Sequence, residues 1–133
     1  MIVLDASAVI ELLLRTAAGN AIAARISSPE VSLHAPHLLD VEVAQVLRRY
    51  VLAGDMSAER GTQAALVLCR LDIARYSHDL LLARIWELRA SLTAYDAAYI
   101  ALAEVLDAPL LTADGRLGRA HGHRARIELV RGG

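Results

Sequence analysis

The segment Met1-Ile2-Val3-Leu4-Asp5 decides the fold class of this chain. Four consecutive apolar residues end in a carboxylate, and a short uninterrupted apolar run is typical of a parallel strand that is buried on both faces. Comparable short runs follow it along the sequence. We predict further strands at Val31–Ala35, Leu71–Ala74, Pro109–Thr112 and Ile127–Val130.

Stretches with helical spacing separate these runs. The longest carries an apolar stripe and is closed by Gly54, which is a common residue just after a helix. Ser57, Ser77 and Thr93 are hydroxyl residues suited to cap the helices that follow them. We predict helices at Ser7–Arg15, Asn20–Ile26, Leu38–Leu52, from Ser57 to about Cys69, Leu80–Ala90 and Ala94–Leu106. Short strands alternating with helices predict an α/β fold, with a short, mostly parallel sheet flanked by helices on both faces.

Composition limits the class of protein further. The 133 residues are enough for one domain, and the 56% hydrophobic content excludes a disordered chain. All 14 basic residues are arginine, against 15 acidic residues, so a protein that holds nucleic acid by bulk positive charge is excluded. No apolar run reaches the ~18 residues of a membrane span, so we expect no membrane partner. The lone Cys69 excludes a disulfide framework and indicates a reducing, cytoplasmic location.

Four carboxylates occupy positions that suit a ligand site. Asp5 and Asp114 follow predicted strands, while Glu42 and Asp96 lie near predicted helix starts. In open parallel sheets, ligands bind beyond the carboxyl ends of the strands. Each acid also has an ordinary explanation: Asp114 opens a turn, Asp96 follows the capping residue Thr93, and Glu42 suits the first turn of a helix. Asp5 is the hardest to explain in this way, because it ends a buried strand.

Gathering these acids has an energetic cost that points to a cation. Two carboxylates ~5 Å apart repel by roughly 3 kcal/mol at an effective dielectric constant of 20. Protons, arginines or a divalent ion would make such a cluster tolerable. Carboxylate oxygens suit Mg²⁺ or Mn²⁺, and these ions support the hydrolysis of phosphodiesters.

Four segments, in this order over essentially the whole chain, resemble the signature blocks of PIN-domain ribonucleases: Val3–Ala8, Leu39–Val43, Thr93–Tyr99 and Leu111–Leu117. Their spacing is similar to that of VapC toxins of bacterial toxin–antitoxin pairs. The resemblance implies a PIN-like three-layer fold in a single domain spanning residues 1–133. It also implies that the catalytic, metal-binding carboxylates are Asp5, Glu42, Asp96 and Asp114, with Ser7, Thr112 and Thr93 as supporting polar residues.

The same resemblance implies an activity and partners. The activity is endoribonucleolytic cleavage by metal-activated water, with Mg²⁺ as cofactor and Mn²⁺ as its substitute. The partners are an RNA substrate, a second copy of the chain in a homodimer, and a VapB-like antitoxin whose tail lies over Ser7–Arg15 and Leu38–Leu52. We expect no direct DNA binding by this chain. Arg116 and Arg119 follow Asp114, so they are candidate contacts for RNA phosphates or else part of a solvated helix face.

Two other function classes remain as alternatives. One is a catalytically silent PIN-like module that binds RNA or protein. The other is a metal-dependent phosphatase of the haloacid dehalogenase type, which also begins with a strand ending in Asp. That type needs a second Asp two residues later, where this chain has Ser7. It also needs a later Lys or Arg near the phosphate, and the sequence contains no Lys. The pair His121 and His123 is more typical of an exposed turn than of a metal site.

Overall fold

The computed structural model describes residues 1–132 and has a five-stranded parallel sheet at its centre. The strands lie in the order β3-β2-β1-β4-β5, so the first strand of the chain is the middle of the sheet. Their bounds are β1 (Ile2–Leu4), β2 (Leu33–Pro36), β3 (Ile73–Tyr76), β4 (Leu110–Thr112) and β5 (Ile127–Leu129). The predicted α/β class is confirmed.

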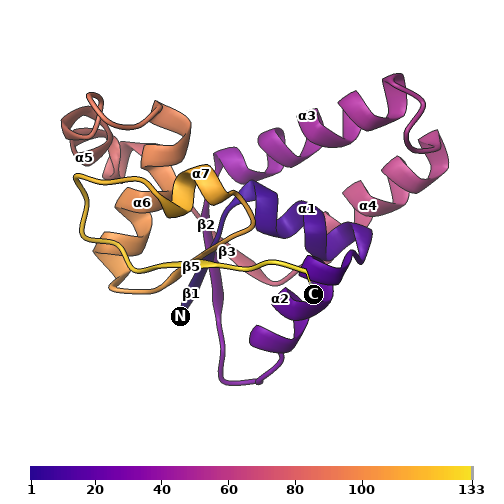
Figure 1. Ribbon diagram of the computed structural model, residues 1–133, viewed down its shortest axis with the longest axis horizontal. Coiled ribbons are helices and arrows are strands. Elements are labelled where there is room, and N and C mark those ends of the chain that lie inside the picture. The colour runs from indigo at the N-terminus through magenta and orange to yellow at the C-terminus, as the bar shows by residue number, and fades with distance from the viewer. Residues whose placement is uncertain (133) are drawn as a thin grey trace.

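The helices divide between the two faces of the sheet. The chain moves from β1 to β2 to β3 in one direction and returns to β4 and β5 in the other, so right-handed crossovers place the two sets of helices on opposite faces. Figure 1 shows this division, with the sheet between the two groups. One group comprises α1 (Ala6–Leu14), α2 (Ala17–Arg25), α3 (Leu38–Leu52) and α4 (Ala58–Arg70). The other comprises the 3₁₀ turn η1 (His78–Leu80), α5 (Leu82–Glu87), α6 (Ala94–Leu106) and α7 (Gly115–Gly118).

The core positions the carboxyl ends of β1 and β4. Val3 and Leu4 of β1 are completely buried, and α6 is buried from Ala97 through Ala103. Four of those seven residues are alanine, so the helix can lie close against the sheet. The direction of the crossovers reverses between β1 and β4, and this reversal is the place where open α/β sheets bind ligands.

Several element boundaries differ from the sequence prediction. Strands β2 and β3 each begin two residues later than predicted, because the main-chain pairing of Leu33 with Ile73 sets their common start. Helix α2 begins at Ala17, where the Thr16 hydroxyl accepts a hydrogen bond from the Gly19 N–H, rather than at Asn20. The predictions followed apolar runs, whereas backbone pairing and caps define the ends.

The predicted helix Leu80–Ala90 is broken in two. The chain forms η1 first, and α5 then starts at Leu82 without a side-chain cap at Leu81. A short helix that was not predicted, α7, follows the Asp114-Gly115 turn, because the Asp114 carboxylate caps it. Within residues 1–132 no single helix has the length and hydropathy of a membrane span. The pair α1 and α2 reaches that length and hydropathy only when the two helices are counted together, and they are bent by 107° relative to each other.

The bend between α1 and α2 depends on a close approach at Gly19. A Cβ atom at this position would lie 1.9 Å from the backbone oxygen of Glu11, which is far inside van der Waals contact. Backbone cannot move away as a flexible side chain can. Only glycine therefore allows the two helices to meet as they do.

We predict that Gly19→Ala lowers the free energy of unfolding by about 1–3 kcal/mol, because the added methyl group overpacks the α1–α2 corner. Denaturation in urea measures the change. Gly118→Ala is the matched control, since a Cβ there would meet only ordinary contacts with Leu129 at 3.7 Å and beyond. Equal stability of the two variants would contradict this account of the corner.

Candidate active site

Asp5 lies at the carboxyl end of the central strand and is almost fully buried. Its Oδ1 accepts hydrogen bonds from the Ala8 N–H at 2.9 Å and from the Ser7 hydroxyl at 2.7 Å. Its Oδ2 accepts a hydrogen bond from the Thr112 hydroxyl, which comes from the end of β4. The carboxylate therefore caps α1 and ties the ends of β1 and β4 together.

The hydroxyls of Ser7 and Thr112 also shape the turn that follows β4. Ser7 Oγ accepts a hydrogen bond from the Ala113 N–H at 2.9 Å, and Thr112 Oγ1 accepts one from the Asp114 N–H at 3.0 Å. The two hydroxyl oxygens lie 3.1 Å apart. A network of short polar side chains thus links Asp5 to the backbone that carries Asp114.

Glu42 reaches the site from the first turns of α3, and Tyr99 holds it there. The Tyr99 hydroxyl donates a 2.6 Å hydrogen bond to Glu42 Oε1, and the tyrosine is 2% exposed. Burial, followed by the Glu42 carboxylate, raises the pKa of Tyr99, so the phenol stays a neutral donor. Sequence reasoning missed Tyr99, although it lies three residues after Asp96 and therefore on the same face of α6.

Asp96 and Asp114 share a cation from the chain itself. The Arg116 Nη2 atom lies 3.5 Å from Asp96 Oδ2 and 3.3 Å from Asp114 Oδ2. Asp114 uses its other oxygen, Oδ1, to accept the Arg116 N–H at the start of α7, and Thr93 accepts the Asp96 N–H at the start of α6. Arg116 is 71% exposed at its side chain, so its ion pairs are screened by solvent.

Burial and the charges of neighbouring acids disfavour ionisation of Asp5, Glu42 and Asp96. Loss of hydration raises the pKa of Asp5 to about 6, and the charge of Asp114 adds to the rise. The pKa values of Glu42 and Asp96 are also raised, chiefly by burial. The Asp96 charge acts on Glu42 and the Asp114 charge acts on Asp96, while Arg116 opposes the rise at Asp96. The four carboxylates are therefore electrostatically coupled at one end of the sheet.

The donor set suits a hard divalent cation by its chemistry. Carboxylate oxygens from Asp5, Glu42, Asp96 and Asp114 are the donors that Mg²⁺ and Mn²⁺ prefer. Within residues 1–132, however, no three Asp, Glu, His or Cys side chains are close enough together to hold a metal ion. Asp96 and Asp114 point at a guanidinium instead. The single metal centre predicted from the sequence stays a prediction.

The remaining predicted residues lie beside this group or away from it. Arg119 lines a hollow together with Asp96 and Arg116, and among residues 1–132 it has no carboxylate within 4 Å. His123 closes a turn, because its ring nitrogens contact the Ala120 carbonyl oxygen and the Ala125 N–H. His121 lines the same hollow as Arg119.

Comparison with known proteins identifies the family of this chain. The family model of the PIN domain matches residues 2–122 of the sequence. The chain belongs to the PIN-domain family. Ribonuclease VapC12 of Mycobacterium tuberculosis is 45% identical to this PIN domain over 130 residues, which are 98% of this chain and 99% of the relative. The relatives therefore identify it as a VapC-type PIN domain.

Two solved structures share the fold of this PIN domain. VapC20 of Mycobacterium tuberculosis, described as a sarcin-ricin loop cleaving toxin, superposes with a TM-score of 0.67 at 14% identity, over 89% of this chain and 93% of its own. VapBC2 from Rickettsia felis, bound to a DNA fragment from its promoter, gives a TM-score of 0.65 at 10% identity, over 98% of this chain and 100% of its own. The predicted PIN-like architecture is confirmed.

We predict that the metal-free PIN domain loses stability as the pH rises from about 4 to about 6. The folded Asp5 carboxyl has a pKa of about 6 against an ordinary value of 3.8, so the folded state binds this proton more tightly than the unfolded state. The resulting stabilisation is present below the ordinary pKa and is lost as the pH passes the folded value. The free energy of unfolding should fall by about 2 kcal/mol over this interval, out of about 3 kcal/mol for the complete titration.

Urea denaturation in EDTA across this pH interval measures the effect. Asp5→Asn should flatten the dependence, because asparagine still caps a helix but does not titrate. Asp72→Asn is the control, since Asp72 is exposed and lies before β3, at the opposite end of the sheet. Glu42 and Asp96 should leave a smaller dependence in Asp5→Asn, whereas an undiminished one would show that Asp5 is not responsible.

Proposed function

We propose that this PIN domain is a Mg²⁺-dependent endoribonuclease and acts as the toxin of a VapBC-type toxin–antitoxin pair. The observation that carries the proposal is the set of four coupled carboxylates at the carboxyl ends of β1 and β4 and the starts of α3 and α6. The names of the relatives, among them Ribonuclease VapC12, support RNA as the substrate class.

Each acid has a role that follows from how it is held. Asp5 is fixed by three hydrogen bonds, so its carboxylate is preorganised rather than free to rotate. Glu42 is oriented by Tyr99, and Asp96 is placed by the first turn of α6. A divalent ion held by these acids and Asp114 would lower the pKa of a bound water and neutralise charge on a phosphodiester. We propose Mg²⁺ for this role, with Mn²⁺ as a substitute.

Arg116 provides the charge balance when such an ion is absent. A guanidinium between Asp96 and Asp114 relieves their repulsion in the same way as a divalent ion, so the two cations compete for the same oxygens. Arg116 lies at the surface, which lets its side chain swing out into solvent when a stronger cation enters.

We predict that Asp5→Asn and Asp96→Asn each reduce cleavage of single-stranded RNA by about a hundredfold or more, because each removes a charge needed to bind the ion. EDTA should abolish cleavage by the unaltered protein, and Mg²⁺ or Mn²⁺ should restore it. Gel analysis of end-labelled RNA gives the rates.

Asp40→Asn is the matched control, since Asp40 is a neighbour of Glu42 in sequence but pairs with Arg75 at 2.8 Å. It should cut RNA at an unchanged rate. Full activity in EDTA would refute metal dependence. Binding of RNA without cleavage by the unaltered protein would favour the catalytically silent module instead.

The proposed homodimer is supported by an apolar surface beside α5. Leu80, Leu82 and Trp86 are more than half exposed, and so is Tyr95 at the start of α6. A hollow of about 230 Å³ lies between Leu82, Tyr95 and Leu38. Exposed apolar groups in such a contiguous patch are typical of an association surface. We propose that a second copy of the chain covers it.

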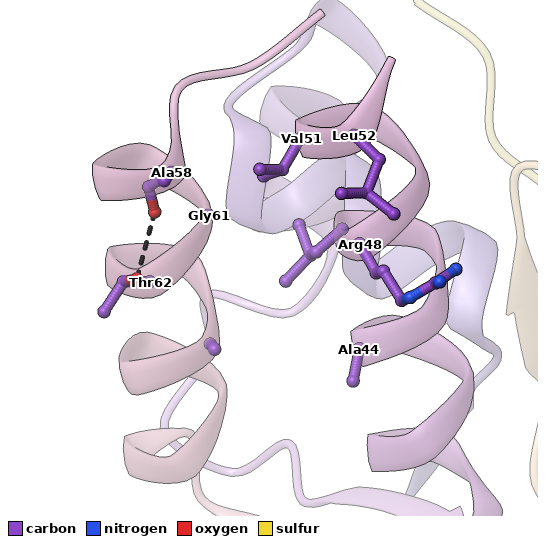
Figure 2. A pocket seen from close by; sticks show the side chains of 9 residues that line it. Ala44, Arg48, Val51, Leu52, Ala58, Gly61 and Thr62 are labelled. Atoms are coloured by element: carbon purple, nitrogen blue, oxygen red, sulfur yellow. Dashed lines mark hydrogen bonds between the residues drawn. The ribbon is translucent and has the colours of Figure 1, made fainter. Parts of the chain in front are cut away.

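The proposed antitoxin is supported by a second apolar surface, on the α3–α4 hairpin, which includes α3 of the predicted antitoxin surface but no residue of α1. A hollow of about 340 Å³ lies between the two helices (Figure 2). Small residues such as Ala44 and Gly61 line it, and Leu52 and Val51 point toward it. An amphipathic segment of an antitoxin would place its apolar side chains there. We propose that any DNA binding belongs to that partner and not to this chain, and that the pair is cytoplasmic.

We predict that Leu82→Glu converts a dimer into a monomer, because it places a charge at the centre of the α5 surface. Leu52→Glu should leave the dimer intact and weaken binding of a co-encoded antitoxin. Sedimentation velocity measures the first effect and calorimetric titration the second. A strictly monomeric unaltered protein would remove the homodimer from the proposal.

A further inference from the structure

Positive charge is concentrated in the last part of the sequence. Residues 115–133 contain five arginines and one glutamate, whereas the preceding 114 residues contain nine arginines and fourteen acids. The nearly neutral total therefore conceals a basic segment, which begins immediately after Asp114.

The fold separates these five arginines into two groups. Arg126 pairs with Asp107 at 2.7 Å, and the Arg124 N–H donates to Glu104 at 2.7 Å, so both lie against the acidic end of α6. The other three, Arg116, Arg119 and Arg131, lie around Gly115. A Cβ at Gly115 would be 3.3 Å from Arg119 Nη1 and 3.3 Å from Arg131 Nη2, which makes these two guanidinium groups near neighbours.

Strand pairing brings Arg131 to this place. The Val130 N–H donates to the Thr112 carbonyl oxygen at 2.8 Å, so the segment after β5 continues alongside the end of β4. Parallel strands have their carboxyl ends at one edge of the sheet. Arg131 therefore emerges at the same edge as Asp5 and Asp114, although it lies seventeen residues after Asp114 in the sequence.

Arg119 and Arg131 differ from Arg116 in having no anionic partner among the residues that the structure describes. Within residues 1–132, neither lies within 4 Å of a carboxylate, whereas Arg116 contacts both Asp96 and Asp114. Two neighbouring guanidinium groups without a counter-charge repel each other and attract an anion. Their planar forks suit the oxygens of a phosphate group.

A hollow of about 340 Å³ adjoins Arg119 but is not lined by Arg131, and it ends at Asp96 of the acidic group. Its lining includes Arg119, Arg116 and His121 from the segment after β4, and Thr93 and Asp96 from the start of α6. Asp96 belongs both to the lining of this hollow and to the four carboxylates, so the hollow adjoins the acidic group. A strand whose scissile phosphate lies at the carboxylates would therefore continue into a recess with basic groups along one side.

We propose that Arg119 and Arg131 form a phosphate clamp, which holds the RNA backbone within a few nucleotides of the cleaved bond. This proposal rests on the proposed function. The clamp is a positioning element: it holds a phosphodiester that is not cut, so that the neighbouring one lies at the carboxylates. It also supplies the local positive charge that the whole chain lacks.

The clamp is tested by the salt dependence of RNA binding in EDTA, with Asp5→Asn as background so that no cleavage occurs. Fluorescence anisotropy of a short unstructured RNA gives the dissociation constant at several salt concentrations. For single strands, each phosphate contact contributes about 0.7 to the slope of log affinity against log salt. Replacing both Arg119→Ala and Arg131→Ala should reduce the slope by about 1.4.

Three controls separate the clamp from other effects. Arg119→Lys with Arg131→Lys should retain the slope, because the charge is kept. Arg70→Ala should also retain it, since Arg70 ends α4 just before β3 and lies at the opposite edge of the sheet. Both clamp residues are exposed, so the melting temperature should be unchanged; Arg119→Ala alone provides the same test with about half the loss of slope.

The outcomes distinguish the clamp from the enzyme. An unchanged slope in the alanine variants overturns the clamp, and so does an equal loss in Arg70→Ala. If the unaltered protein still cuts RNA with Mg²⁺ in either case, the proposed function stands without the clamp. Absence of RNA binding and of RNA cleavage by every variant overturns both.

Discussion

The desolvated carboxylate of Asp5 is the constraint on which the rest of the structure depends. Its hydrogen-bond donors, from Ala8, Ser7 and Thr112, are all neutral, so they orient the carboxylate without cancelling its charge. The same three bonds start α1 and join β1 to β4, and the Ser7 and Thr112 hydroxyls that donate two of them also accept the bonds that hold the turn carrying Asp114. The hydrogen bonds of this carboxylate hold the fold, whereas its charge, which burial disfavours, costs stability until a cation or a proton balances it.

Capping and chemistry are not rival explanations of these acids. Asp114 caps α7 with one carboxylate oxygen and turns the other toward Arg116. Asp5 likewise caps α1 while it accepts a bond from the neighbouring strand. A cap fixes the orientation of a side chain. The capping signals that explain Asp5 and Asp114 without a function therefore also direct both carboxylates toward one region.

The sequence predicts the parts of this structure that depend on local pattern. Buried strands are recognisable as short apolar runs, and the geometry of a parallel sheet predicts that the acids at their carboxyl ends lie at one edge. The pairing of Glu42 with Tyr99 and the approach of Arg131 to Gly115 could not be predicted, because each depends on how distant segments meet. The start of β2 was misplaced for the same reason: pairing with β3 sets it.

The position of β1 at the centre of the sheet also determines when the site can exist. Ile2–Leu4 are synthesised well before their partner β4, which begins at Leu110, and the hydroxyl that reaches Asp5 belongs to Thr112. Such long-range contacts form late in folding. A nascent chain therefore carries Asp5 without an assembled site until Thr112 has been synthesised.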